Sequence, residues 1–196
     1  MRIRTLDDEL ELHRIETPEE AAALDARMAE AYQTVFSGEP YFEAFSRDEA
    51  EAVWRKLTRT PDNITLVATT TEGVIAGFSA AVPLVARPDV MRQLAGLVPA
   101  QATYYLAELG VLPRWRGRQL GQTLISERLR LMDDRRFTHV VLRIAEGQHR
   151  SFEMYRALEF TDMGVSMPVT TRRIDGSSRT DTRYFMSRVL SQVRLP

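Results

Sequence analysis

The sequence contains no cysteine, and Lys56 is its single lysine among 196 residues. The missing cysteine excludes disulfides, zinc thiolate sites and a cysteine nucleophile. Acidic and basic residues nearly balance, with a net charge of -1, and no block of like charge stands out. Nucleic acid is therefore not expected as a partner. The arginine-rich basic complement suits bidentate contacts to phosphate, or it reflects genomic composition.

A long apolar run is also missing. The longest apolar stretch, 74–86, is shorter than the roughly 18 residues that indicate a membrane span. The first nine residues lack an apolar core and carry acids, so no signal peptide is expected. We also expect no membrane partner and a cytoplasmic location. With 44% hydrophobic residues the chain can bury one sizeable core, and a single domain over 1–196 is expected.

Helical signals dominate the first third of the chain. Weak alternation over 10–15 indicates a strand, and Thr17-Pro18-Glu19-Glu20 has the pattern of a capping box with proline at the first helical position. Apolar residues then recur at helical spacing as far as Val35, and a second capping box opens another helix at Ser46. Two β-rich segments, 64–70 and 74–82, are joined by a short turn and predict a hairpin.

The remaining segments alternate between strand and helix patterns. We expect helices around 89–97 and over 119–135 and 148–158, and strands over 104–111, 138–145, 160–169 and 182–189. The polar segment 172–181 is expected to be a loop between the last two strands. This order predicts an α/β (α+β) fold in which a mixed central sheet is flanked by helices.

The segment 109–121 runs from a strand through a basic loop into an amphipathic helix. Pro113 ends the strand, and the loop then delivers backbone N–H groups to the N-terminus of the helix. These free donors and the positive end of the helix dipole make an anion site, for which a pyrophosphate is the expected guest. From spacing alone, an ordinary surface turn with solvated arginines explains the segment equally well.

This segment resembles motif A of the GNAT (Gcn5-related N-acetyltransferase) family, whose loop reads Gln/Arg-x-x-Gly-x-Gly/Ala. The matching residues are Arg116-Gly117-Arg118-Gln119-Leu120-Gly121, preceded by Val111-Leu112-Pro113. Gln119 replaces the central glycine of the motif. The segment 142–160 resembles motif B through Tyr155 and Leu158-Glu159-Phe160, with Gln148 in place of the usual asparagine. The resemblance covers nearly the whole chain.

The resemblance implies acetyl-CoA, or another acyl-CoA, as co-substrate and no metal. It implies that the backbones of Leu109 and Val111 pair with the pantetheine arm, and that the arm lies where the strands ending at Val111 and Ala145 splay apart. It also assigns the pyrophosphate to the N–H groups of 116–121, with Arg116 as a direct ligand. The cofactor-binding set is therefore Leu109, Val111, Arg116, Gly117, Arg118, Gln119, Leu120, Gly121 and Gln148.

An acid and a base near the thioester would each accelerate transfer by about 10²–10⁴-fold. Glu108 is the candidate base, because a carboxylate within an otherwise apolar strand is costly unless it is paired or has a raised pKa. The alternative is a structural ion pair with an arginine. Tyr155 is the candidate acid by its resemblance to the motif B tyrosine. The alternative for Tyr155 is a core aromatic, since its neighbours Phe152 and Leu158 share its helical spacing.

The expected function is N-acyl transfer from acyl-CoA to a primary amine, small molecule or peptide, by direct attack in a ternary complex. A catalytically inactive acyl-CoA-binding sensor or scaffold is the alternative. An unrelated nucleotide-binding protein is disfavoured, because the Lys-Ser/Thr of a P-loop and a Gly-x-Gly-x-x-Gly motif are missing. By the resemblance, 36–42 borders the acceptor, whereas Tyr32 is expected in the core. The three histidines show no metal spacing, and the sequence leaves a homodimer open.

Overall fold

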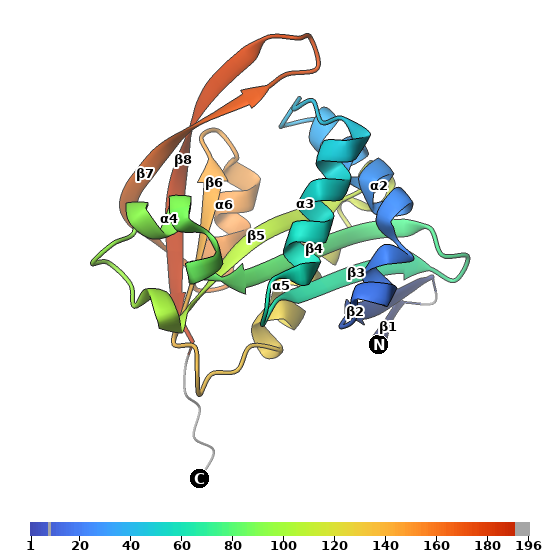
Figure 1. Ribbon diagram of the computed structural model, residues 1–196, viewed down its shortest axis with the longest axis horizontal. Coiled ribbons are helices and arrows are strands. Elements are labelled where there is room, and N and C mark those ends of the chain that lie inside the picture. Colours follow the sequence, from blue (N-terminus) through green and yellow to red (C-terminus); the bar gives the residue numbers. More distant parts are fainter. Residues whose placement is uncertain (8, 191–196) are drawn as a thin grey trace.

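The computed structural model of the chain describes residues 1–7 and 9–190 and contains one eight-stranded sheet covered by helices on both faces (Figure 1). The strand order is β1-β2-β3-β4-β5-β6-β8-β7. Within the described residues every neighbouring pair is antiparallel except β5 and β6. The strands are β1 (Arg2–Asp7), β2 (Leu10–Ile15), β3 (Ile64–Thr70), β4 (Ile75–Pro83), β5 (Thr103–Val111), β6 (His139–Ala145), β7 (Thr161–Arg172) and β8 (Ser178–Val189).

The outer layers consist of the α-helices α1 (Pro18–Ala22), α2 (Asp25–Ser37), α3 (Arg47–Arg59), α4 (Pro88–Gln93), α5 (Leu120–Arg130) and α6 (His149–Ala157). Apolar side chains of α2, α3 and α4 pack on one face of the sheet, here called the α3 face. Those of α5 and α6 pack on the opposite face, the α5 face. The predicted mixed sheet with helices on both faces is therefore confirmed.

Both predicted capping boxes are present. The side chains of Thr17 and Ser46 accept hydrogen bonds from the backbone N–H three residues further on. The side chains of Glu20 and Glu49 in turn accept hydrogen bonds from the backbone N–H of the cap residues. The prediction of one continuous helix as far as Val35 was wrong, because the chain breaks between α1 and α2. At this break Trp54 of α3 donates its indole N–H to the Ala21 carbonyl at 3.0 Å.

Two other sequence expectations need correction. Helix α5 ends at Arg130 rather than at 135, because the chain turns there to pack Phe137 against Tyr104, with ring centroids 4.0 Å apart. Half of the polar segment 172–181 belongs to the strands β7 and β8. These strands are joined side by side, and Thr170 and Thr180 share a hydrogen bond of 2.8 Å. Polarity here marks a hairpin exposed on both faces, which alternation of apolar residues cannot reveal.

The β7–β8 hairpin extends past the end of the sheet and approaches the loop between α2 and α3 (Figure 1). The Ala44 N–H donates to the Arg172 carbonyl at 2.8 Å, and the Ile174 N–H donates to the Phe42 carbonyl at 3.1 Å. These backbone bonds tie together two segments that are about 130 residues apart in sequence. The loop and the hairpin therefore form one rim above the carboxyl ends of β5 and β6.

Strands β5 and β6 separate along their length, as the family resemblance implied. They pair only from Thr103 to Tyr105, opposite His139 to Val141. A register shift in the β4–β5 ladder lies at the same level, since Ala80 pairs with Glu108 but Ala81 pairs with Leu106. Such a bulge bends the strand and changes the direction of its side chains. Beyond it, the edge of β5 that faces β6 has no strand partner among the described residues.

No helix formed by residues 1–7 or 9–190 has the length and apolar character needed to cross a bilayer.

Candidate active site

A chamber of about 250 Å³ lies where β5 and β6 separate. Its floor comes from both strands, and its walls come from α2, α6, the α2–α3 loop and the β7–β8 hairpin. Since the chamber opens between two strands, groups from both faces of the sheet can reach it. The lining residues used below are Tyr32, Phe36, Tyr41, Glu43, Glu108, Leu109, Arg143, Gln148, Tyr155 and Arg183.

Glu108 reaches the chamber from the α3 face of the sheet. At the bulge of β5 the side chains of Ala107 and Glu108 both lie on the α3 face of the sheet. Ala107 packs with the α3-face cluster, and Glu108 lies beside Tyr32 of α2. Burial raises the pKa of Glu108 to about 7, against the lowering effects of Arg87, Arg143 and the Tyr32 hydroxyl. The carboxyl group therefore exchanges a proton near neutral pH, as a general base must.

Tyr155 reaches the same chamber from the α5 face. Its ring is buried and meets Phe160 edge-on, with centroids 5.4 Å apart. Burial raises the pKa of Tyr155, while the neighbouring Arg128 guanidinium opposes this rise. The hydroxyl is therefore protonated at neutral pH and available as a donor.

Arg128 links the two candidate residues, and the sequence reasoning missed it. This arginine of α5 is fully buried. Its Nη1 donates to the carbonyls of Ala80 at 2.8 Å and Glu108 at 2.9 Å, which are paired opposite each other at the bulge. A charged side chain is almost never fully buried without such partners. The one guanidinium fixes the backbone beneath Glu108 and lies beside the hydroxyl of Tyr155.

The basic loop enters α5 through a left-handed residue. Gln119, which occupies the place of the family's central glycine, is the N-cap with φ 61° and forms no side-chain cap. Gly117, with φ 78°, has open space where a Cβ would lie. A Cβ on Gly121 would point between Val111 and Met154, at 3.7 and 3.9 Å. The N-terminus of α5 is thus bare of side-chain caps and approachable by an anion.

The arginines of this loop are engaged within the protein. Arg116 donates to the carbonyls of Val111 and Glu39, both at 3.1 Å, and so joins the end of β5 to the α2–α3 loop. Arg118 pairs with Glu9 at 3.0 Å and lies over the ring of Trp115. Both side chains are exposed and can turn towards a ligand without breaking the core.

The other predicted cofactor residues divide into two groups. Leu109 and Gln148 line the chamber, and Gln148 is the N-cap of α6. Val111 and Leu120 pack towards the α5-face core, so only their backbones are available to a ligand. The residues predicted to bind the cofactor therefore lie along one path, from the chamber to the N-terminus of α5.

The predicted acceptor segment 36–42 contributes only in part. Phe36 and Tyr41 line the chamber, but Phe42 is 43% exposed and does not. Tyr32 is buried in the core as predicted and also touches the chamber. Glu43 is a further chamber residue that the sequence reasoning missed, because its burial depends on the distant Arg183, whose Nη2 lies 2.7 Å from its carboxylate.

The histidines lie away from the chamber lining. His13 contacts Thr69 at 3.2 Å, His139 contacts Thr138 at 2.8 Å, and His149 is exposed at the start of α6. Across residues 1–7 and 9–190, no three histidine or acidic side chains are grouped to hold a metal ion.

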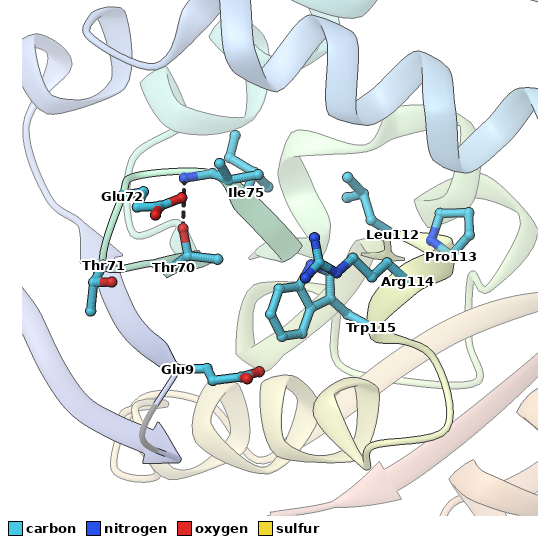
Figure 2. A pocket seen from close by; sticks show the side chains of 10 residues that line it. Glu9, Thr70, Thr71, Glu72, Ile75, Leu112, Pro113, Arg114 and Trp115 are labelled. Atoms are coloured by element: carbon cyan, nitrogen blue, oxygen red, sulfur yellow. Dashed lines mark hydrogen bonds between the residues drawn. The ribbon is translucent and has the colours of Figure 1, made fainter.

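A second, larger hollow of about 560 Å³ lies on the other side of the basic loop (Figure 2). Figure 2 shows Trp115 and Arg114 along one side and the β3–β4 turn with Thr70 and Glu72 on the other. The hollow is open, and neither Glu108 nor Tyr155 lines it. Its size therefore does not make it the reactive site.

Comparison with known proteins identifies relatives of the chain. A family model described as Acetyltransferase (GNAT) family matches residues 26–160. A search of curated proteins found no match.

Solved structures share the fold at low sequence identity. A protein of Acinetobacter baylyi assigned as an acetyltransferase superposes with a TM-score of 0.67 and 16% identity, over 94% of this chain and 95% of that one. The protein yncA of Salmonella typhimurium, solved with acetyl-CoA, gives 0.62 and 19%, over 95% and 97%. A GNAT superfamily phosphinothricin acetyltransferase of Sinorhizobium meliloti, also solved with acetyl-CoA, gives 0.63 and 21%, over 92% and 88%.

Proposed function

Since the chain belongs to the GNAT family of acetyltransferases, we propose that it transfers the acetyl group of acetyl-CoA to a primary amine by direct attack within a ternary complex. One observation carries the proposal. Glu108 and Tyr155 reach a single chamber from opposite faces of the sheet, at the level where β5 and β6 separate. An amine can therefore approach from one face and the leaving thiol can depart on the other.

The residues along the splay fit acetyl-CoA, which when bound supplies the thioester. The free edge of β5 at Leu109 and Val111 offers backbone groups to the amides of the pantetheine arm. Residues 116–121 offer N–H donors to the diphosphate, and the small size of Gly117 and Gly121 keeps that approach open. Gln148 offers its amide beside the arm.

Glu108 acts as the general base in this mechanism. Amines are mostly protonated at neutral pH, and the attacking nitrogen needs its lone pair. With a pKa of about 7, Glu108 is ionised in a large share of molecules and still accepts a proton effectively. Its place at the bulge directs the carboxylate towards the α3 face, where the α2–α3 loop and the hairpin enclose the acceptor.

Tyr155 acts as the general acid. When the C–S bond breaks, the sulfur leaves as a thiolate, and the Tyr155 hydroxyl donates a proton to it. The charge of Arg128 stabilises the developing tyrosinate and keeps its pKa from rising further under burial. Once the C–N bond has formed, Glu108 releases to solvent the proton that it took from the amine, and the Tyr155 tyrosinate takes a proton from solvent, which restores the pair.

Release of free thiol from acetyl-CoA, measured over a panel of amines and peptides, tests this function. We expect amine-dependent release that falls about 10²-fold or more in Glu108→Gln and in Tyr155→Phe, with acetyl-CoA binding unchanged by titration. Near-parental rates in both folded variants would refute the acid–base assignment. Binding without turnover of any acceptor would favour the sensor or scaffold instead. The single domain over 1–196 and the cytoplasmic location stay predictions.

A further inference from the structure

Arg143 of β6 lines the chamber, and its ion pair with Asp89 of α4 is long. Its guanidinium donates to the thioether sulfur of Met167 at 3.3 Å, which is a weak acceptor. The nearest carboxylate, that of Asp89, lies 3.8 Å away, and Arg87 already holds it through two bonds of 3.2 and 3.1 Å. The side chain of Arg143 is only 20% exposed. A guanidinium removed from water in this way is poised to receive an anion.

The other arginine of the chamber is committed to a partner. Arg183 pairs with Glu43 at 2.7 Å, and both side chains are largely buried. This pair closes the rim between the hairpin and the α2–α3 loop. Arg143 is therefore the chamber arginine that is best able to take an anionic ligand.

The position of Arg143 separates it from the cofactor's diphosphate. Arg143 has the same sheet side as Val141, which packs in the α3-face cluster, whereas the basic loop leads into α5 on the opposite face. Glu108 also faces the α3 side, on the neighbouring strand, and feels the charge of Arg143. An anion on Arg143 would thus lie on the acceptor's side of the sheet, next to the base.

We propose that the acceptor is a small amine that also carries a carboxylate or similar oxyanion, and that Arg143 binds this anionic group while the amino group lies at Glu108. This inference rests on the proposed acetyl transfer. The chamber of about 250 Å³ corresponds to about eight waters at roughly 30 Å³ each, so it suits an amino-acid-sized molecule. Binding the anion completes the Arg143 site and orients the amine for attack.

Matched pairs of amines test the proposal by their kcat/KM values. Suitable pairs are L-methionine with 3-(methylthio)propylamine, L-phenylalanine with 2-phenylethylamine, and 2-aminoethylphosphonate with ethanolamine. We expect the acid-bearing member to be preferred at least tenfold in at least one pair. Arg143→Met should abolish that preference, because kcat/KM for the acid-bearing member should fall at least tenfold more than kcat/KM for the neutral amine, whereas Arg143→Lys should retain part of it. Arg135→Met, which removes an exposed arginine outside the chamber, is the control and should behave as the parent.

Equal or better turnover of the neutral members in every pair, or a preference that survives Arg143→Met, would overturn the proposal. A binding measurement covers the case in which none of these amines is acetylated. With CoA present, N-acetyl-L-methionine should bind the parent at least tenfold more tightly than N-acetyl-3-(methylthio)propylamine, and Arg143→Met should remove the difference. Equal affinities would overturn the inference about Arg143, whereas missing turnover with selective binding would count against the acetyl transfer alone.

Discussion

Burial raises the pKa of both residues on which the proposed chemistry depends, but their neighbours differ. Glu108 is kept close to neutrality by burial, and three cationic or hydroxyl neighbours partly offset that cost. Tyr155 is kept protonated by burial, with Arg128 as the opposing influence. Two groups whose environments tune them for opposite proton transfers form an acid–base pair. Each environment can be tested at the level of the single residue.

Glu108 is expected to make stability depend on pH. Its folded pKa of about 7 lies above the ordinary value of 4.5, so the folded state favours the protonated form. Stability is then lost as pH rises from about 4.5 to 7. Glu108→Gln removes this loss and should stabilise the protein above pH 7 by up to about 3 kcal/mol, but much less at pH 5. Urea unfolding at pH 5 and pH 8 measures the difference. An equal effect at both values would contradict the raised pKa.

At the scale of elements, the bulge of β5 and the turn into α5 are the two irregular features that build the site. The first turns Glu108 to the α3 face, and Arg128 satisfies the carbonyls that the irregular ladder leaves there. The second places Gln119 in a left-handed conformation that costs a residue with a Cβ roughly 1–2 kcal/mol. Both features are irregular in backbone conformation, and both lie along the surface proposed to face the ligands.

Substitutions in the loop that leads into α5 are expected to change the affinity for CoA. Gln119→Gly should leave CoA affinity unchanged or stronger, because glycine adopts the left-handed conformation without strain. Gly121→Val should weaken CoA binding at least tenfold, because its branched side chain would lie in the approach to the helix N-terminus. Gly121→Ala controls for folding, since its Cβ makes only ordinary contacts at 3.7 Å or more. Titration calorimetry measures the three affinities. Normal binding by a folded Gly121→Val would show that the diphosphate lies elsewhere.

Glu43, in the rim formed by the α2–α3 loop and the hairpin, is expected to affect both stability and the pKa of Glu108. Glu43→Gln leaves the buried Arg183 without its carboxylate and should destabilise the protein by about 3 kcal/mol. The charge of Glu43 also raises the pKa of Glu108, so its removal should move the acidic limb of kcat/KM to lower pH. Glu39→Gln, exposed in the same loop, is the matched control. Unfolding and pH–rate profiles measure both effects. A limb that moves to higher pH would contradict this electrostatic coupling.

At the scale of the whole molecule, the sequence predicted what depends on local order. The capping boxes, the β3–β4 hairpin, the basic loop and the placement of Glu108 in a central strand are all local patterns. The pairs Glu43–Arg183 and Arg143–Asp89 join segments that are 140 and 54 residues apart in sequence, so no local spacing pattern predicts them. Arg128 was missed because an arginine in an amphipathic helix usually faces solvent. The chamber residues that depend on long-range pairing were therefore harder to predict than the local motifs.

In the proposed mechanism, one chamber, opened by the separation of β5 from β6, receives acetyl-CoA from the α5 face and the amine from the α3 face. The larger hollow beside Trp115 is left without a catalytic role. This division places the cofactor on one defined path through the sheet, and bound cofactor should slow local opening along that path.

Amide hydrogen exchange with and without saturating acetyl-CoA tests this central claim most directly. We predict that exchange slows in 106–111, 117–122 and 148–155, the free edge of β5, the loop into α5 and the start of α6. The β3–β4 turn at 70–75, which borders the larger hollow, should exchange unchanged. Protection of 70–75 without protection of 106–111 would contradict the account, because acetyl-CoA would then bind in the hollow beside Trp115 and away from Glu108.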